Sequence, residues 1–129
     1  MNSNPLAVAR GCLEAYVSKD RAAIEALIAE DYHFTSPIDN ALDRETYFTR
    51  CWPNSKAMTG FDYIYQIEDA ERAFIVYEAH MTGGKTFRNS EVYTVRDGKL
   101  IATEVYFGWD LPHKAPKGGF IDNGGQAHA

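Results

Sequence analysis

Apolar side chains recur at helical spacing near the start of the chain and at strand spacing from Phe61 onward. Asn4 can cap a helix, and Pro5 suits the first helical position because its missing N–H would have no partner there. The spacing predicts a helix from Pro5 to near Ser18, with one apolar face: Leu6, Ala9, Leu13, Tyr16 and Val17.

Two shorter helices are predicted before the strands begin. Asp20 can cap one that presents Ile24, Leu27 and Ile28, and Asp43 can cap another that Pro53 ends. The apolar positions of the latter are Tyr47, Phe48, Cys51 and Trp52. Between the two helices, Tyr32 to Ser36 alternates like a strand and 36–40 reads as a loop.

The second half of the chain predicts strand after strand. Alternation places Phe61, Tyr63, Tyr65 and Ile67 on one side of the first strand, and Ile75, Tyr77, Ala79 and Met81 on one side of the next. Phe87 to Trp109 then predicts a long hairpin, in which Asp97-Gly98 supplies a type I′ turn. Helices followed by a meander of strands indicate an α+β fold with helices on one face of a curved sheet.

Glu91 is the most informative position of this hairpin. It shares a face with Phe87, Asn89, Tyr93 and Val95, whereas the opposite face carries Arg88 and Arg96. Burying two guanidinium groups costs more than burying one carboxyl, so we expect Glu91 to point inward. A buried Glu tends to keep its proton or to find a partner.

Length and charge exclude several classes of protein. The 129 residues suit one domain, predicted over 1–111, and the Gly- and Pro-rich stretch 112–129 is predicted to be a tail. A net charge of −5 with scattered basic residues argues against a nucleic-acid partner or a membrane partner. Without a leader or a spanning segment, a cytoplasmic protein is expected. Cys12 and Cys51 indicate neither a disulfide framework nor a zinc site.

The order of these elements resembles the nuclear transport factor 2-like (NTF2-like, cystatin-like) superfamily, and within it the SnoaL-like proteins. The resemblance rests on the helix pair ending in D-Y-H-F-T-S-P, on the short helix after it, and on V-R-D-G-K-L-I and V-Y-F-G. It implies a cone-shaped fold with a strongly curved antiparallel or mixed sheet. That fold is shared by cyclases, isomerases, dehydratases, epoxide hydrolases and proteins that only bind, so it decides no function.

The steroid isomerases of this superfamily suggest roles for individual residues. Their site has an Asp base opposite a Tyr and a protonated Asp that bind an oxyanion. Tyr16 matches the oxyanion Tyr late in the first helix, and Glu91 stands at the place of the protonated acid. Ser36 occupies the base position before Pro37, where a hydroxyl cannot replace a carboxylate. Asp39, three residues on, is the remaining candidate for the base, although turns favour Asp for local reasons.

The aromatic content predicts a cavity for a small hydrophobic molecule with one or two oxygens. Each aromatic residue could instead simply fill the core, and Tyr16 could be an ordinary core tyrosine. Glu91 could likewise be a structural acid. The predicted lining is Phe34, Ser36, Tyr63, Tyr77, Met81, Tyr93, Phe107 and Trp109. The histidines lack metal-ligand spacing, so neither a metal nor a cofactor is expected.

Three functions remain open from the sequence. One is a cofactor-independent isomerase, cyclase or dehydratase that acts next to a carbonyl, with Tyr16, Glu91 and Asp39 as catalytic residues. The second is a ligand-binding or protein-interaction module without turnover, and the third is a subunit that scaffolds a larger assembly. An apolar outer sheet face with Phe74, Val76, Val92 and Tyr106 predicts a homodimer through the sheet.

Overall fold

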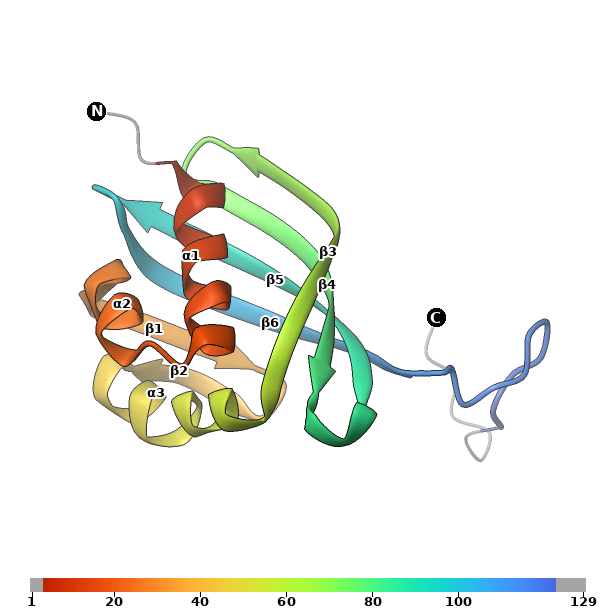
Figure 1. The fold of residues 1–129 in the computed structure, drawn as a ribbon. Coiled ribbons are helices and arrows are strands. Elements are labelled where there is room, and N and C mark those ends of the chain that lie inside the picture. The colour runs from red at the N-terminus through yellow and green to blue at the C-terminus, as the bar shows by residue number, and fades with distance from the viewer. Residues whose placement is uncertain (1–3, 123–129) are drawn as a thin grey trace.

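The computed structural model describes residues 4–122, as three α-helices, two short 3-10 helices and a six-stranded sheet (Figure 1). The helical elements are α1 Pro5–Ser18, α2 Arg21–Leu27, α3 Arg44–Arg50, η1 Trp52–Ala57 and η2 Thr82–Gly84. The strands are β1 Ile28–Ser36, β2 Asp39–Asp43, β3 Met58–Asp69, β4 Arg72–Met81, β5 Thr86–Arg96 and β6 Lys99–Leu111.

All three predicted helix caps are confirmed. The side chains of Asn4, Asp20 and Asp43 accept hydrogen bonds from backbone N–H groups three residues on, at 3.1, 3.0 and 2.9 Å. Each cap satisfies a donor that the first helical turn leaves free. The start of every α-helix is therefore fixed by a residue that can be read from the sequence.

The predicted α+β class is also confirmed. The strand order is β2-β1-β6-β5-β4-β3, and all neighbours are antiparallel except β1 and β6, which are parallel. The helices lie against one face of this curved mixed sheet, with α1 running across it (Figure 1). Among residues 4–122, no helix covers the other face, and the core lies between α1 and the sheet.

The stretch predicted as a loop, 36–40, instead turns the chain into an added edge strand. Ser36 pairs with Asp39, and β2 returns antiparallel to β1. This strand has only five residues, and the first two, Asp39 and Asn40, are of types that favour turns. The remaining residues are too few to show the alternation that predicts a strand.

A β-bulge in β3 corrects the predicted face of two residues. Phe61 and Tyr63 pack against the core, but the register shifts between Tyr63 and Tyr65. The extra residue turns Tyr65 and Ile67 to the outer face, where they are 69% and 63% exposed. The prediction that all four share one side is wrong for this reason.

The long hairpin of β5 and β6 forms as predicted. Asp97 and Gly98 adopt positive φ angles of 54° and 77°, which a type I′ turn requires. Glu91, Tyr93 and Val95 point inward and are 9%, 2% and 0% exposed.

The chain continues beyond β6 without helix or strand, and Phe120 is 85% exposed there. The part of the predicted tail that covers 123–129, with His128, lies outside the described residues. Within the described residues, no helix is both long enough and apolar enough to cross a membrane.

Candidate ligand cavity

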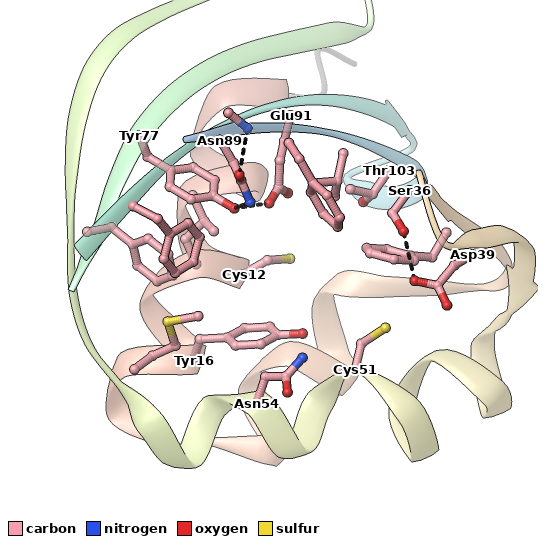
Figure 2. Close-up of a pocket in the computed structure, with 18 of the residues that line it drawn as sticks. Cys12, Tyr16, Ser36, Asp39, Cys51, Asn54, Tyr77, Asn89, Glu91 and Thr103 are labelled. Carbon is pink, nitrogen blue, oxygen red and sulfur yellow. Dashed lines mark hydrogen bonds between the residues drawn. The ribbon is translucent and has the colours of Figure 1, made fainter. Parts of the chain in front are cut away.

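A cavity of about 450 Å³ is lined by residues of α1, η1 and the sheet. This volume lies within the range of small-molecule sites. Nine residues proposed from the sequence line it: Tyr16, Phe34, Ser36, Asp39, Tyr77, Glu91, Tyr93, Phe107 and Trp109. Figure 2 shows Glu91, Tyr77 and Asn89 on one wall, Tyr16, Cys51 and Asn54 on the facing wall, and Ser36 with Asp39 at one side.

Two other proposed residues do not line this cavity. Tyr63 lies under the guanidinium group of Arg10, 4.9 Å from its ring centre, near the start of α1. Met81 ends β4, where it pairs with Met58. Phe61 and Tyr77, which pack edge-to-face, line the cavity from β3 and β4 instead.

Glu91 is buried in the cavity wall and has no basic partner among the described residues. The Tyr77 hydroxyl donates a hydrogen bond to its Oε2. Burial raises the pKa of Glu91 above its usual value, because the charged form loses its hydration, and the nearby hydroxyls of Tyr77 and Tyr93 oppose this only in part. The carboxyl therefore holds its proton to a higher pH than an exposed Glu.

Asn89 and Gly108 extend this contact across three strands. The Asn89 Nδ2 donates to the Tyr77 hydroxyl at 3.4 Å, and the Gly108 N–H donates to Asn89 Oδ1 at 3.1 Å (Figure 2 shows the links among Asn89, Tyr77 and Glu91). The alternation of β5 puts Asn89 beside Glu91, so the sequence carried the signal for its place in the wall. The pairing with Tyr77 required the register of β4 against β5.

Tyr16 faces the cavity from α1 but is paired with another tyrosine. Its hydroxyl lies 2.6 Å from the Tyr47 hydroxyl, and its ring packs edge-on against Trp52 at 5.0 Å. Burial raises the pKa of both hydroxyls above the usual value for tyrosine. Whichever oxygen accepts in this pair, the accepting group still has its own hydrogen to donate.

Asp39 reaches the cavity from β2, held by two donors. Ser36 Oγ donates to Oδ2 at 2.8 Å, and Arg50 Nε donates to Oδ1. Burial raises the pKa of Asp39, but the hydrogen bonds from Arg50 and Ser36 lower it more, so the net shift is downward. The carboxylate is ionised and anchored, which makes it a weak base as it stands.

The two cysteines line the cavity as unreactive thiols. Burial raises the pKa of Cys12 to about 12 and that of Cys51 to about 11, so neither forms a thiolate near neutral pH. Sequence reasoning assigned them no place in the cavity. Cys51 faces inward at the end of α3, at one of the apolar positions that helical spacing had marked.

Among the described residues, potential metal ligands gather on the outer sheet face and not in the cavity. Oxygen or nitrogen atoms of Asp62, Glu78 and His80 lie within 4.8 Å of one another. His80 is already bonded to Asp62 at 2.8 Å, and Glu78 accepts from Arg88 at 3.2 Å. These side chains therefore already have hydrogen-bond partners within the protein. Among the described residues, the cavity wall holds no group of three such ligands.

Comparisons with known proteins agree with this architecture. Residues 9–103 match the model of the SnoaL-like domain family. No curated protein matches the chain significantly. More than one hundred solved chains do, including a protein from Kribbella flavida with 18% identity, a TM-score of 0.75 and coverage of 83% of this chain and 88% of its own.

Two further solved structures indicate the breadth of the fold. An NTF2-like protein from Burkholderia pseudomallei has 17% identity and a TM-score of 0.65, over 84% of this chain and 92% of its own. A protein described as an LEH-like epoxide hydrolase from M. tuberculosis has 16% identity and a TM-score of 0.66, over 78% and 80%. These likenesses show the fold alone. With most of its folded part matched, the chain belongs to the SnoaL-like domain family of the NTF2-like superfamily.

Proposed function

We propose that the cavity binds a small, mostly apolar molecule through an acceptor oxygen, with protonated Glu91 as the hydrogen-bond donor. The observation that carries this proposal is a buried carboxyl that has a tyrosine and no base as its partner, in the wall of an open cavity. A neutral acid in an apolar wall is a strong donor to a carbonyl or to an oxyanion.

The chemistry that follows is proton transfer next to a carbonyl, without a cofactor. A base removes a proton from the carbon beside the carbonyl, Glu91 hydrogen-bonds the enolate oxygen, and the same proton returns to another carbon. Isomerisation requires no more than this, and cyclisation and dehydration begin with the same step. Besides Glu91, the carboxyl side chains that line the cavity are Asp39 and Asp110, and Asp39 is the candidate for the base.

The first test is a 13C NMR titration of the carboxyl groups, with Glu91 assigned from the Glu91→Gln variant. A raised pKa at Glu91 is expected. A value in the ordinary range for glutamate would overturn the proposal, because the group would then be ionised near neutral pH and unable to donate.

The second test uses a matched pair of probes, 1-tetralone and tetralin, which share a skeleton but differ in the carbonyl. The wild type should bind the ketone more tightly, and Glu91→Leu should remove the preference without weakening tetralin. One lost hydrogen bond to a charged or strongly polar group corresponds to roughly tenfold in affinity. Equal binding of both probes by the wild type would contradict the proposal.

The observed contacts of Asp39 favour a second candidate, binding without turnover. A carboxylate that accepts from both Arg50 and Ser36 is a poor base, since both donors stabilise the ion. Exchange of the C2 protons of 1-tetralone in D2O separates the two candidates. Acceleration that Asp39→Asn abolishes supports an enzyme, and binding without acceleration supports a binding module.

A further inference from the structure

The backbone N–H of Gly108 fixes the orientation of the Asn89 amide. It donates to Asn89 Oδ1 at 3.1 Å, and a backbone N–H can only donate. The amide oxygen must therefore face β6 and the amide nitrogen must face Tyr77. Gly108 permits this approach because a Cβ there would lie 2.2 Å from the Arg88 carbonyl oxygen of β5.

This orientation sets the direction of the hydrogen bonds that follow. Asn89 Nδ2 donates to the Tyr77 hydroxyl oxygen, so Tyr77 directs its own hydrogen onward to Glu91 Oε2. Because Oε2 is thereby an acceptor, the proton of neutral Glu91 belongs on Oε1. A chain of donors that starts at the backbone thus decides which carboxyl oxygen carries the proton.

Tyr93 supplies a second donor beside that proton. Its hydroxyl is buried and lies beside the Glu91 carboxyl, close enough to lower the pKa of that group, but it forms no hydrogen bond of good geometry with any residue among 4–122. It lines the cavity from the same face of β5 as Glu91. A buried donor without a well-formed hydrogen bond is costly, and a ligand oxygen placed between Tyr93 and Glu91 would satisfy it.

We propose that Asn89 is a positioning residue which, held by the Gly108 N–H, directs the Glu91 proton into the cavity, where Glu91 and Tyr93 form a two-donor site for one oxygen of the ligand. This site selects neutral molecules whose oxygen accepts two hydrogen bonds, such as a ketone, an aldehyde or an epoxide. It rests on the proposed function, in which Glu91 binds the ligand oxygen. It also assigns to Tyr93 the second donor role that the sequence had suggested for Tyr16.

The direction of the chain is tested in the ligand-free protein by infrared spectroscopy, with Glu91→Gln identifying the band. The carbonyl stretch of protonated Glu91 reports the bond that Oε2 accepts from Tyr77. Asn89→Leu leaves Tyr77 free to accept from Glu91, so the stretch should move to higher frequency and the Glu91 pKa upward. Asn89→Asp should do the same, because its carboxylate attracts the Tyr77 hydrogen away from Glu91.

Asn54 provides matched controls, since it lines the facing wall of the same cavity (Figure 2). Asn54→Asp adds the same charge and Asn54→Leu the same apolar group, but neither interrupts the chain to Glu91. Both should leave the Glu91 carbonyl stretch in place. A stretch that is unchanged in both Asn89 variants, or shifted equally by the Asn54 variants, would overturn the assignment of Asn89.

Ligand probes test the second donor. Tyr93→Phe should weaken the binding of 1-tetralone roughly tenfold and leave the binding of tetralin unchanged. An unchanged affinity for the ketone would exclude Tyr93 from the site.

A failure of this proposal can be told apart from a failure of the proposed function. An ordinary Glu91 pKa in the wild type defeats both proposals, but a raised pKa that is insensitive to Asn89 defeats this one alone.

Discussion

Glu91 is surrounded by groups that stay neutral, so burial dominates its ionisation. The titratable side chains around it are Cys12 and Tyr16 from α1, Tyr32 from β1, Cys51 after α3, Tyr77 from β4 and Tyr93 from β5. The pKa of each is raised, chiefly by its own burial, which leaves every one of them uncharged near neutral pH. No positive charge in this set offsets the cost of ionising the carboxyl, and the hydroxyls of Tyr77 and Tyr93 offset it only in part.

The raised pKa of Glu91 predicts that the free energy of unfolding falls as the pH rises above the usual range for glutamate. In that window the unfolded chain releases the proton while the folded protein keeps it, until the pH passes the folded pKa. Glu91→Gln should remove this loss. Its stability relative to the wild type should rise between pH 4 and the folded pKa, by about 1.4 kcal/mol for each unit of difference.

Denaturant unfolding of both proteins at a series of pH values measures this difference. Below pH 4 the stability difference between wild type and variant should become independent of pH. Two curves that run parallel from pH 4 to 8 would mean that Glu91 ionises with an ordinary pKa.

The pKa of Asp39 is shifted downward, opposite to that of Glu91, and the shift should depend on Arg50. Its lowered pKa stabilises the fold above the usual range for aspartate, and this stability is lost as the pH falls through the folded pKa. Arg50→Gln should move the Asp39 pKa upward in an NMR titration. Because the Arg50 side chain is 51% exposed and solvent screens its charge, the cost in stability should be small.

The exposed pair of Arg21 and Glu25 on α2 supplies the control for this prediction. Arg21→Gln also removes one surface cation and one ion pair but does not touch Asp39, so it should leave the Asp39 pKa in place. An Asp39 pKa that ignores Arg50→Gln, or that moves equally with Arg21→Gln, would show that net charge and not the contact sets its ionisation.

Sequence reasoning at this scale could place side chains on faces but could not pair them. Alternation alone put Glu91 inward, because the other register buried two arginines. The bonds from Tyr77 to Glu91 and from Arg50 to Asp39 join different elements, so they depend on strand register and helix docking. Those are set by the whole core, and no local pattern carries them.

At the scale of the elements, β5 and β6 approach each other so closely at Gly108 that a side chain there would not fit. Gly108→Ala would place a Cβ against the backbone of Arg88, and the strands would have to separate. We expect a loss of roughly 1–3 kcal/mol in the free energy of unfolding, the usual cost of overpacking. Chemical denaturation measures it directly.

Gly60 is the matched control in β3, since a Cβ there meets nothing within 4 Å and its φ is not positive. Gly60→Ala should be close to neutral, or slightly stabilising through the unfolded chain. Equal losses in the two variants would point to a general intolerance of side chains at strand glycines, and the close contact at Gly108 would then explain nothing.

Elements set by interactions between residues close in the sequence could be predicted, and elements set by contacts between distant residues could not. Helix starts and the Asp97-Gly98 turn were predicted because caps and turn residues act within a few positions of one another. The bulge in β3 was not predicted, because Phe61, Tyr63, Tyr65 and Ile67 keep the period-two spacing through the point where the register shifts. The sign of the bulge is the apolar Ile64, which interrupts the alternation and which the strand pairing leaves without a partner residue. A bulge reflects the curvature that the sheet needs to enclose the cavity, which is a property of all its strands.

For the whole molecule, the bulge extends the apolar outer face of the sheet by adding Tyr65 and Ile67 to it. One row runs across four strands through Tyr65, Val76, Ser90 and Tyr106, and the next contains Ile67, Phe74 and Val92. Tyr65, Ile67 and Tyr106 are more than half exposed, and the helices cover only the opposite face (Figure 1). An exposed apolar patch of this kind typically marks an interface.

We propose that a second copy of the chain covers this face. Its apolar rows adjoin a charged end with both signs, where Asp62 and Glu78 lie near Arg88. In a two-fold dimer each patch meets a copy of itself, so apolar rows can pack together while charges of opposite sign face each other. We therefore expect a dimer, with twice the monomer mass of 14.5 kDa.

Light scattering coupled to gel filtration tests this, with Phe74→Glu combined with Tyr106→Glu as the disrupting variant. Two carboxylates on the facing apolar rows should reduce the mass to that of a monomer, because neither has a partner in the interface. Ile38→Glu, at a position 68% exposed beside the turn between β1 and β2, is the control for adding charge and should remain dimeric. If Phe120→Glu in the tail dissociates the dimer while the outer-face variant does not, the contact is made by the tail, and the outer-face dimer is wrong.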